Sequence, residues 1–199
     1  MSPAHVLEPT YRRLKQELLE GTWPGGTKLE AMRLADDFGV SMTPVRDSLN
    51  QLVGEGLVGL TPGEGFRVPV LTEQDLRDIL AVNMSLLETA VSATWSDASA
   101  VEDPVCSDTY PDRLTTAFMT LARGSRNGFL TYLVGRISDR LHPVRKLEPQ
   151  VLPEALAILD RIEQSARASR REQLDVLRHY HEQCHAIVPR LIHLMSKSS

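Results

Sequence analysis

The chain has 199 residues, of which 42% are hydrophobic and 24% charged, and its formal net charge at pH 7 is −4. This composition allows a packed core of one or two domains, while the negative charge counts mildly against nucleic-acid binding. The sequence shows no secretory signal, no apolar run near the ~20 residues of a membrane span and only two cysteines, Cys106 and Cys184, so we expect a cytoplasmic protein without a membrane partner.

The first 40 residues predict two helices separated by a short extended piece. Apolar residues at helical spacing over 7–18 predict an amphipathic helix, which ends at Gly21, and residues 28–29 follow as the extended piece. A second helix is predicted over 32–38. Gly39 should end it, because glycine readily adopts the positive φ found just past a helix C-terminus.

A third helix and a β-hairpin complete this part of the chain. We expect the helix to begin with Thr43 as N-cap and Pro44 as its first residue, where a missing N–H costs nothing. Two apolar-rich runs, residues 57–61 and 66–70, are joined by Pro62-Gly63-Glu64-Gly65 and predict the hairpin. Three helices and a hairpin therefore form the first predicted domain, residues 1–70.

Residues 71–199 predict an all-α bundle. Apolar residues at helical spacing mark five helices, around residues 76–91, 114–121, 130–141, 156–162 and 174–191. Residues 97–111 are polar, contain two prolines and predict a loop. Pro143 is expected to end or kink one helix, and Pro189 to kink the last.

The second and third predicted helices, the turn between them and the hairpin that follows suit DNA binding. The third helix would enter the major groove, with the hairpin as a wing. Residues 20–69 also resemble the DNA-binding domain of the GntR family, particularly its FadR-type branch. The matching residues keep the family's spacing: Gly21, Pro24-Gly25, Leu29, Leu34-Ala35, Gly39-Val40-Ser41, Thr43-Pro44-Val45-Arg46, Leu49, Leu52, Glu55-Gly56-Leu57-Val58, Gly65 and Val68.

The resemblance implies that the start of the third helix and the wing contact DNA. Carried over position by position, it makes Ser41, Thr43, Pro44 and Arg46 candidate contacts and Gly65 the wing-tip glycine. An arginine can grip phosphate or the O6/N7 edge of guanine. Physical reasoning adds Asn50, one turn after Arg46, and backbone contacts from the cations Lys28, Arg12 and Arg13.

Two residues depart from the family pattern. Met42 stands where the family commonly has arginine, and Glu64 replaces a basic or polar residue before the wing glycine. Residues 1–70 contain seven Lys or Arg against nine Asp or Glu. Because each lost phosphate contact lowers affinity and flattens its salt dependence, we expect unusual or weak DNA binding.

The second part of the chain resembles the FCD effector-binding domain, with Phe118, Asn127 and Leu130 matching one of its segments and Asn83 replacing a frequent arginine. Many such domains hold a divalent metal through one Asp and three His. Here these four positions hold Thr115, Met119, Ala155 and His181, so we predict no metal and no cofactor. The resemblance implies a carboxylate effector, and the candidate residues that would bind it are His181, His185, Asn127, Thr115 and Met119.

The leading hypothesis is a homodimeric transcriptional regulator, a repressor or less often an activator, whose affinity for a pseudo-palindromic operator changes when a small molecule binds the helical domain. The alternative is a degenerate winged-helix protein that acts mainly through protein–protein interaction. An enzyme is not expected, because no nucleophile elbow, phosphate loop, paired catalytic carboxylates or closed metal motif is present.

Overall fold

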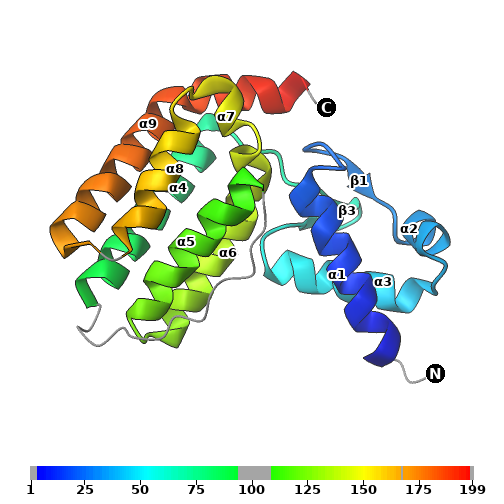
Figure 1. Ribbon diagram of the computed structural model, residues 1–199. Helices are drawn as coiled ribbons and strands as arrows, with labels where there is room; N and C mark the ends of the chain where they lie inside the picture. The colour runs from blue at the N-terminus through cyan, green and yellow to red at the C-terminus, as the bar shows by residue number, and fades with distance from the viewer. Residues whose placement is uncertain (1–3, 94–108, 167, 198–199) are drawn as a thin grey trace. The chain divides into compact units, whose positions relative to one another are not determined.

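The computed structural model describes residues 4–93, 109–166 and 168–197, with side chains from residue 7 onwards. The predicted loop over 97–111 lies mostly outside these residues, as does Cys106. The chain forms two compact units, residues 1–71 with 195–199 and residues 72–194 (Figure 1). The fold class is as predicted: a mainly helical protein with a small antiparallel sheet after its N-terminal helices.

The first unit is built around one helix, of which a single side is buried. Its elements are α1 (Ala4–Glu20), β1 (Lys28–Leu29), α2 (Ala31–Phe38), α3 (Met42–Gly54), β2 (Gly59–Thr61) and β3 (Gly65–Arg67). Both α1 and α2 pack on α3, and α1 crosses it (Figure 1). Leu14 of α1 and Val45, Leu49 and Leu52 of α3 have no exposed surface, so α3 is anchored by its apolar stripe.

The sheet has three strands rather than the two predicted. β1 pairs antiparallel with β3, and β3 also pairs with β2, giving the order β1-β3-β2. The hairpin strands are shorter than expected. The backbone N–H groups of Leu57 and Val58 donate to the carbonyl of Leu52 at 3.0 and 3.3 Å, closing the end of α3. These two residues are buried in the helical core and lie outside the strands.

The start of α3 differs from the prediction by two residues. The N-cap is Ser41, in an extended conformation with φ −76° and ψ 164°, so that Thr43 and Pro44 are the second and third helical residues. Pro44 is tolerated there because the first helical N–H groups have no intrahelical partner in any case. This shift places Arg46 just after the first turn of the helix.

Gly39 confirms the predicted end of α2. Its φ of 67° is left-handed, and its N–H donates to the carbonyls of Ala35 and Asp36. A Cβ on Gly39 would meet no atom within 4 Å, so an alanine would fit the space but not the backbone conformation. We expect Gly39→Ala to lower the free energy of unfolding by about 1–2 kcal/mol, measured by urea denaturation. The exposed Gly128→Ala, at the start of a helix, is the control and should not destabilise the protein.

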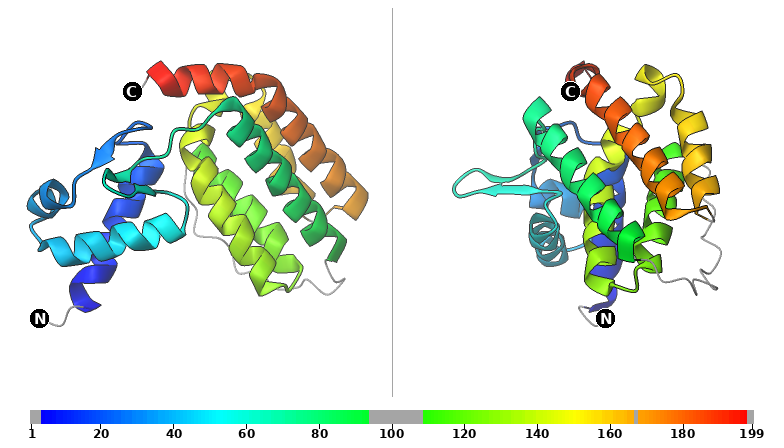
Figure 2. Two further views of the ribbon diagram at one scale, coloured as in Figure 1. Left: turned by 180° about the vertical axis from the view of Figure 1, so that it is seen from behind. Right: turned by 90° about the vertical axis from the view of Figure 1, so that its left-hand side faces the viewer.

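The second unit is an all-α bundle. Its helices are α4 (Glu73–Ala93), α5 (Tyr110–Gly124), α6 (Gly128–Arg145), the short and unpredicted α7 (Glu148–Val151), α8 (Ala155–Ser165) and α9 (Arg170–Lys197). The helices α4, α5 and α6 pack on one another, and the long helices run side by side (Figure 2). Within the described residues, no helix is both long and apolar enough to cross a bilayer.

Pro143 does not end its helix, and the kinks predicted at Pro143 and Pro189 stay predictions. α6 continues past Pro143 to Arg145, and α9 continues past Pro189. Pro189 has no N–H for the carbonyl of His185, four residues earlier. The guanidinium of Arg77 on α4 donates to that carbonyl instead, at 3.1 Å, and so replaces the missing helical bond.

Candidate nucleic-acid interface

The exposed face of α3 carries the predicted contact residues. Thr43, Arg46 and Asn50 are exposed, and because they lie three and four residues apart they share one side of the helix. The opposite side, with Val45 and Leu49, is fully buried. The core therefore fixes α3 and leaves its polar side facing outwards, as a recognition helix requires.

Arg46 is an available cation on this face. It is exposed and makes no hydrogen bond or ion pair that the structure records in the described part of the chain. The Ser41 side chain makes no capping bond to the α3 backbone, so its hydroxyl is also available. Pro44 is half-buried and has no N–H, which limits it to apolar contact.

The wing is a tight hairpin that projects from the helices of its unit (Figure 2). Pro62 and Gly63, which has a φ of 81°, occupy the central positions of a turn closed by a 3.0 Å bond from the Glu64 N–H to the Thr61 carbonyl. Gly65, predicted as the wing-tip glycine, has a φ of 86° but begins β3 just after this turn. The tip proper is Pro62-Gly63.

The acidic residue of the wing has a basic partner that sequence reasoning missed. The Arg67 Nε lies 3.5 Å from the Glu64 carboxylate, and Arg67 also donates to the carbonyl of Gly26 at 3.3 Å. The negative charge of Glu64 therefore partly neutralises the charge of Arg67 on the same hairpin. It would also repel a DNA phosphate. The sequence signal for this pair was the three-residue spacing between Glu64 in the turn of the predicted hairpin and Arg67 in the strand that follows.

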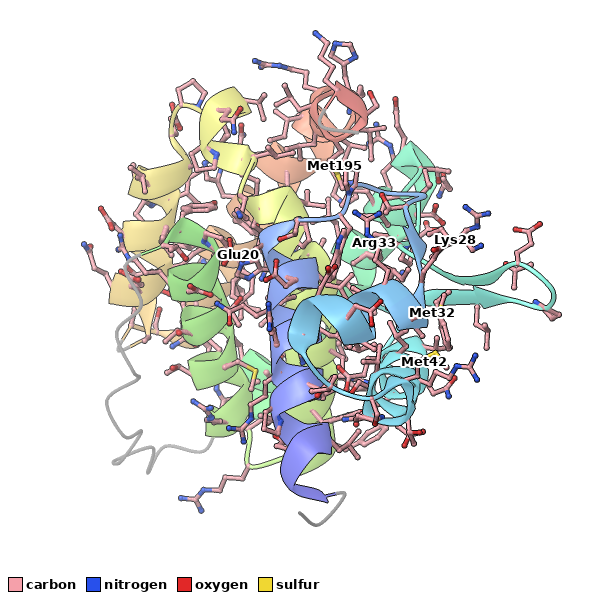
Figure 3. All side chains as sticks on the ribbon, turned by 90° about the vertical axis from the view of Figure 1, so that its right-hand side faces the viewer. Glu20, Lys28, Met32, Arg33, Met42 and Met195 are labelled. Atoms are coloured by element: carbon pink, nitrogen blue, oxygen red, sulfur yellow. The ribbon has the colours of Figure 1, made fainter. Side chains whose placement is uncertain are left out.

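Three further exposed residues come from β1 and the start of α2. Lys28 is exposed and pairs with Glu30 at 3.3 Å, whereas Arg33 is exposed with no partner recorded in the described residues. Met32 is 67% exposed, and Met42 at the start of α3 is 41% exposed. In Figure 3 these residues lie on the same side of the unit. Arg33 was not predicted, because it interrupts an otherwise apolar and acidic helix.

The two cations of α1 are already engaged. Arg12 pairs with Glu8 of the preceding turn at 2.7 Å, and the guanidinium of Arg13 lies 4.0 Å from the centre of the Phe38 ring. Exposed pairs of this kind are weak and can be exchanged for a phosphate. Their use as DNA contacts stays a prediction.

The candidate effector residues of the second unit are only partly brought together. Asn127 is the N-cap of α6. Its side-chain oxygen accepts a 3.0 Å hydrogen bond from the N–H of Leu130 and so stabilises the start of the helix. Thr115 and His181 belong to a buried polar cluster, defined here as Asn83, Tyr110, Thr115, Arg145, Glu148, Tyr180, His181 and Cys184. Met119 and His185 are half-buried. Effector binding by all five residues stays a prediction.

His181 is neutral and both of its ring nitrogens are used. Nδ1 lies 2.8 Å from the Leu177 carbonyl, which only accepts, so Nδ1 holds the proton and Nε2 accepts from the Asn83 amide at 3.0 Å. Burial is the main cause that lowers the pKa of His181 to about 4. In this arrangement His181 orients Asn83 and has no proton left to donate to a carboxylate.

The carboxyl of Glu148 is held by two tyrosines. The hydroxyl of Tyr110 donates to it at 2.8 Å and that of Tyr180 at 3.1 Å. Burial raises the pKa of Glu148, and burial likewise raises the pKa of the neighbouring Cys184 thiol. A thiol kept protonated in this way is a poor nucleophile. Among the described residues, no group of three or more His, Cys, Asp or Glu side chains is placed to hold a metal.

Comparison with known proteins agrees with this architecture. Residues 8–68 match the family model described as bacterial regulatory proteins, gntR family. An uncharacterized HTH-type transcriptional regulator, YdhC of Bacillus subtilis (strain 168), is 25% identical over 197 residues, 87% of each chain. The HTH-type transcriptional repressor GlaR of Escherichia coli (strain K12) is 33% identical over 82 residues, which are 41% of this chain but only 37% of GlaR.

Solved structures share the fold over most of the chain. Escherichia coli McbR/YncC superposes with a TM-score of 0.65 at 19% identity, covering 93% of this chain and 97% of that one. A putative GntR transcriptional regulator from Rhodococcus sp. RHA1 gives 0.67 at 16% identity, covering 92% and 96%.

The winged helix with its outward-facing α3 is an architecture that fits the HTH-type transcriptional regulators to which the chain is similar. Residues 8–68 of the chain are thus similar to the helix-turn-helix domain of gntR-family regulators. Both of these curated relatives, YdhC and GlaR, are described as HTH-type transcriptional regulators.

Proposed function

We propose that the protein is a homodimeric repressor that binds a pseudo-palindromic operator through the outward face of α3 and through the wing. The observation that supports this most directly is Arg46, an exposed cation with no recorded partner in the described residues, on a helix whose other side is fully buried. Thr43 and Asn50 flank it on the same side, Ser41 precedes the helix, and the three supply hydroxyl and amide groups. Arg33, Lys28 and Arg67 add candidate phosphate contacts.

We further propose that the second unit is an FCD-type domain and that a small molecule bound there changes operator affinity. Such coupling requires the ligand to bind more tightly to one of two conformations that differ in DNA affinity. The buried polar cluster supports this proposal, because a core that served packing alone would need none of its ionisable groups.

The experiment is a fluorescence-anisotropy titration of a labelled duplex from the region upstream of the protein's own gene, at several salt concentrations, with a scrambled duplex as competitor. Operator binding should be sequence-selective, and its affinity should fall steeply with salt. Sedimentation of the free protein should give a dimer. Binding that is equal for both duplexes, or undetectable, would instead favour the protein-interaction alternative, to which the exposed Met32 and Met42 side chains are suited.

Removal of the wing acid should strengthen DNA binding. Glu64→Gln removes one negative charge that, in the proposed complex, faces the DNA backbone, and it releases Arg67 from its 3.5 Å ion pair. We expect operator affinity to rise a few-fold and the salt dependence to steepen by about one phosphate contact. The matched control is Glu163→Gln, an acid of the second unit that pairs with Arg113 at 2.6 Å and should leave the titration unchanged.

A further inference from the structure

Met42 is an exposed apolar side chain at the start of α3. It is the first residue of the helix and is 41% exposed. Arg46 follows it by four residues and Asn50 by eight, and both are exposed, so the three side chains form one row along the helix. Met42 therefore lies directly beside the side chains that are proposed to contact DNA.

The position of Met42 does not serve the helix itself. The first turn of a helix is stabilised by capping or acidic side chains, and a thioether supplies neither a strong acceptor nor a charge. The anchoring contacts of α3 come from other residues, since Val45 and Leu49 have no exposed surface. Met42 thus leaves apolar surface available to whatever contacts the outward row of α3.

The chemistry of a thioether restricts which part of a DNA duplex Met42 can recognise. It has no charge and no hydrogen-bond donor, so a phosphate is a poor partner. In the major groove, thymine is distinguished by its 5-methyl group, which is read by apolar contact. Base edges are contacted by the N-terminal residues of a recognition helix, and Met42 is the first residue of α3.

We infer that Met42 contacts the 5-methyl group of a thymine in each operator half-site and so makes the protein select thymine there. The unbranched methionine side chain is flexible enough to cover a methyl group from several directions. An arginine, common at this position in the family pattern, would instead favour guanine or phosphate. The inference rests on the proposed function and names one base that the proposed interface reads.

Met32 is more exposed than Met42 but is less suited to this role. It is 67% exposed and lies at the start of α2, on the same side of the unit as Met42 (Figure 3). In a helix-turn-helix the first helix crosses the DNA backbone, and the second enters the groove. Met32 is therefore placed towards phosphates, which offer no apolar partner.

The test uses the full-length protein and the labelled duplex from the region upstream of its own gene, in two forms. One form contains thymine, and in the other uracil replaces every thymine, which removes the methyl groups and keeps the base pairs. The wild type should bind the uracil form about 4-fold more weakly per half-site, or about 15-fold for the two half-sites of a dimer, because each loses the burial of one methyl group. Single replacements then locate the thymine.

Variants at position 42 assign this methyl dependence to its side chain. Met42→Ala is too short to reach the methyl group, so the ratio of the two affinities should fall by the same factor of about 15. Met42→Leu keeps a large apolar side chain and should retain most of the ratio. The salt dependence should be unchanged in both variants, because no phosphate contact is lost. The control Leu156→Ala, which truncates a 55% exposed side chain of α8, should keep the wild-type ratio.

The outcomes separate this inference from the proposed function. Equal affinity ratios in the wild type and in Met42→Ala would overturn the inference, as would a wild type that binds both forms equally. Either result leaves operator recognition standing if the thymine form still competes better than the scrambled duplex. A wild type that shows no such preference would overturn the proposed function as well. Should Met42→Ala not fold, Met42→Gln, which is polar and of similar length, repeats the comparison.

Discussion

Arg46→Ala is expected to abolish selective operator binding while leaving the fold intact. Arg46 is exposed on the outward face of α3, so the substitution opens no cavity and should change the unfolding free energy little. A bidentate arginine–guanine contact contributes about 1–3 kcal/mol of discrimination per half-site, and a two-fold dimer loses it twice. In an anisotropy titration, the preference for operator over scrambled duplex should fall at least ~100-fold.

A matched charge removal separates recognition from general electrostatics. Arg171→Ala deletes a guanidinium whose side chain is 92% exposed on α9 and should keep the wild-type preference. Arg33→Ala should weaken binding to operator and scrambled duplex alike, because a phosphate contact does not distinguish sequences. Should Arg46→Ala retain the full preference, the interface proposed for α3 would be wrong and the wing would become the main candidate.

The N-terminal fold was predictable because its determinants are local. Gly39 ends α2 by its backbone freedom, and Val45, Leu49 and Leu52 define the buried side of α3 by spacing alone. The errors concern groups whose hydrogen bonds depend on distant residues. Leu57 and Val58 have an apolar composition typical of a strand, yet their N–H groups are used at the end of α3.

The buried polar cluster was less predictable, because its members come from five helices. The sequence proposed His181 as an effector-binding residue, and the structure buries it to 3% exposure. Nothing in the local sequence indicates that Asn83, 98 residues away, donates a hydrogen bond to its Nε2. Arg145 was missed for the same reason: near the end of a helix a basic residue is ordinarily a surface residue.

His181 should make the stability of the protein fall as the pH is lowered. Its pKa is about 4 in the folded protein and about 6.5 when unfolded, so the unfolded state gains a proton first. Stability is therefore fully present above pH 6.5 and is lost as the pH falls towards 4. By linkage the loss approaches about 3 kcal/mol, to be measured by urea unfolding at intervals between pH 8 and 4.

A variant without the imidazole isolates this contribution. His181→Gln is expected to be less stable than the wild type at pH 8, because it leaves the Leu177 carbonyl or the Asn83 amide without its partner. The difference in unfolding free energy between the two proteins should then narrow as the pH falls from 6.5 to 4, since only the wild type loses the His181 contribution. Glu148 acts in the opposite sense, because burial raises its pKa above the unfolded value and its contribution is lost as the pH rises. Both proteins share Glu148, so its contribution cancels in the comparison. A difference in unfolding free energy that stayed constant with pH would show that His181 is protonated as readily in the folded protein as in the unfolded chain.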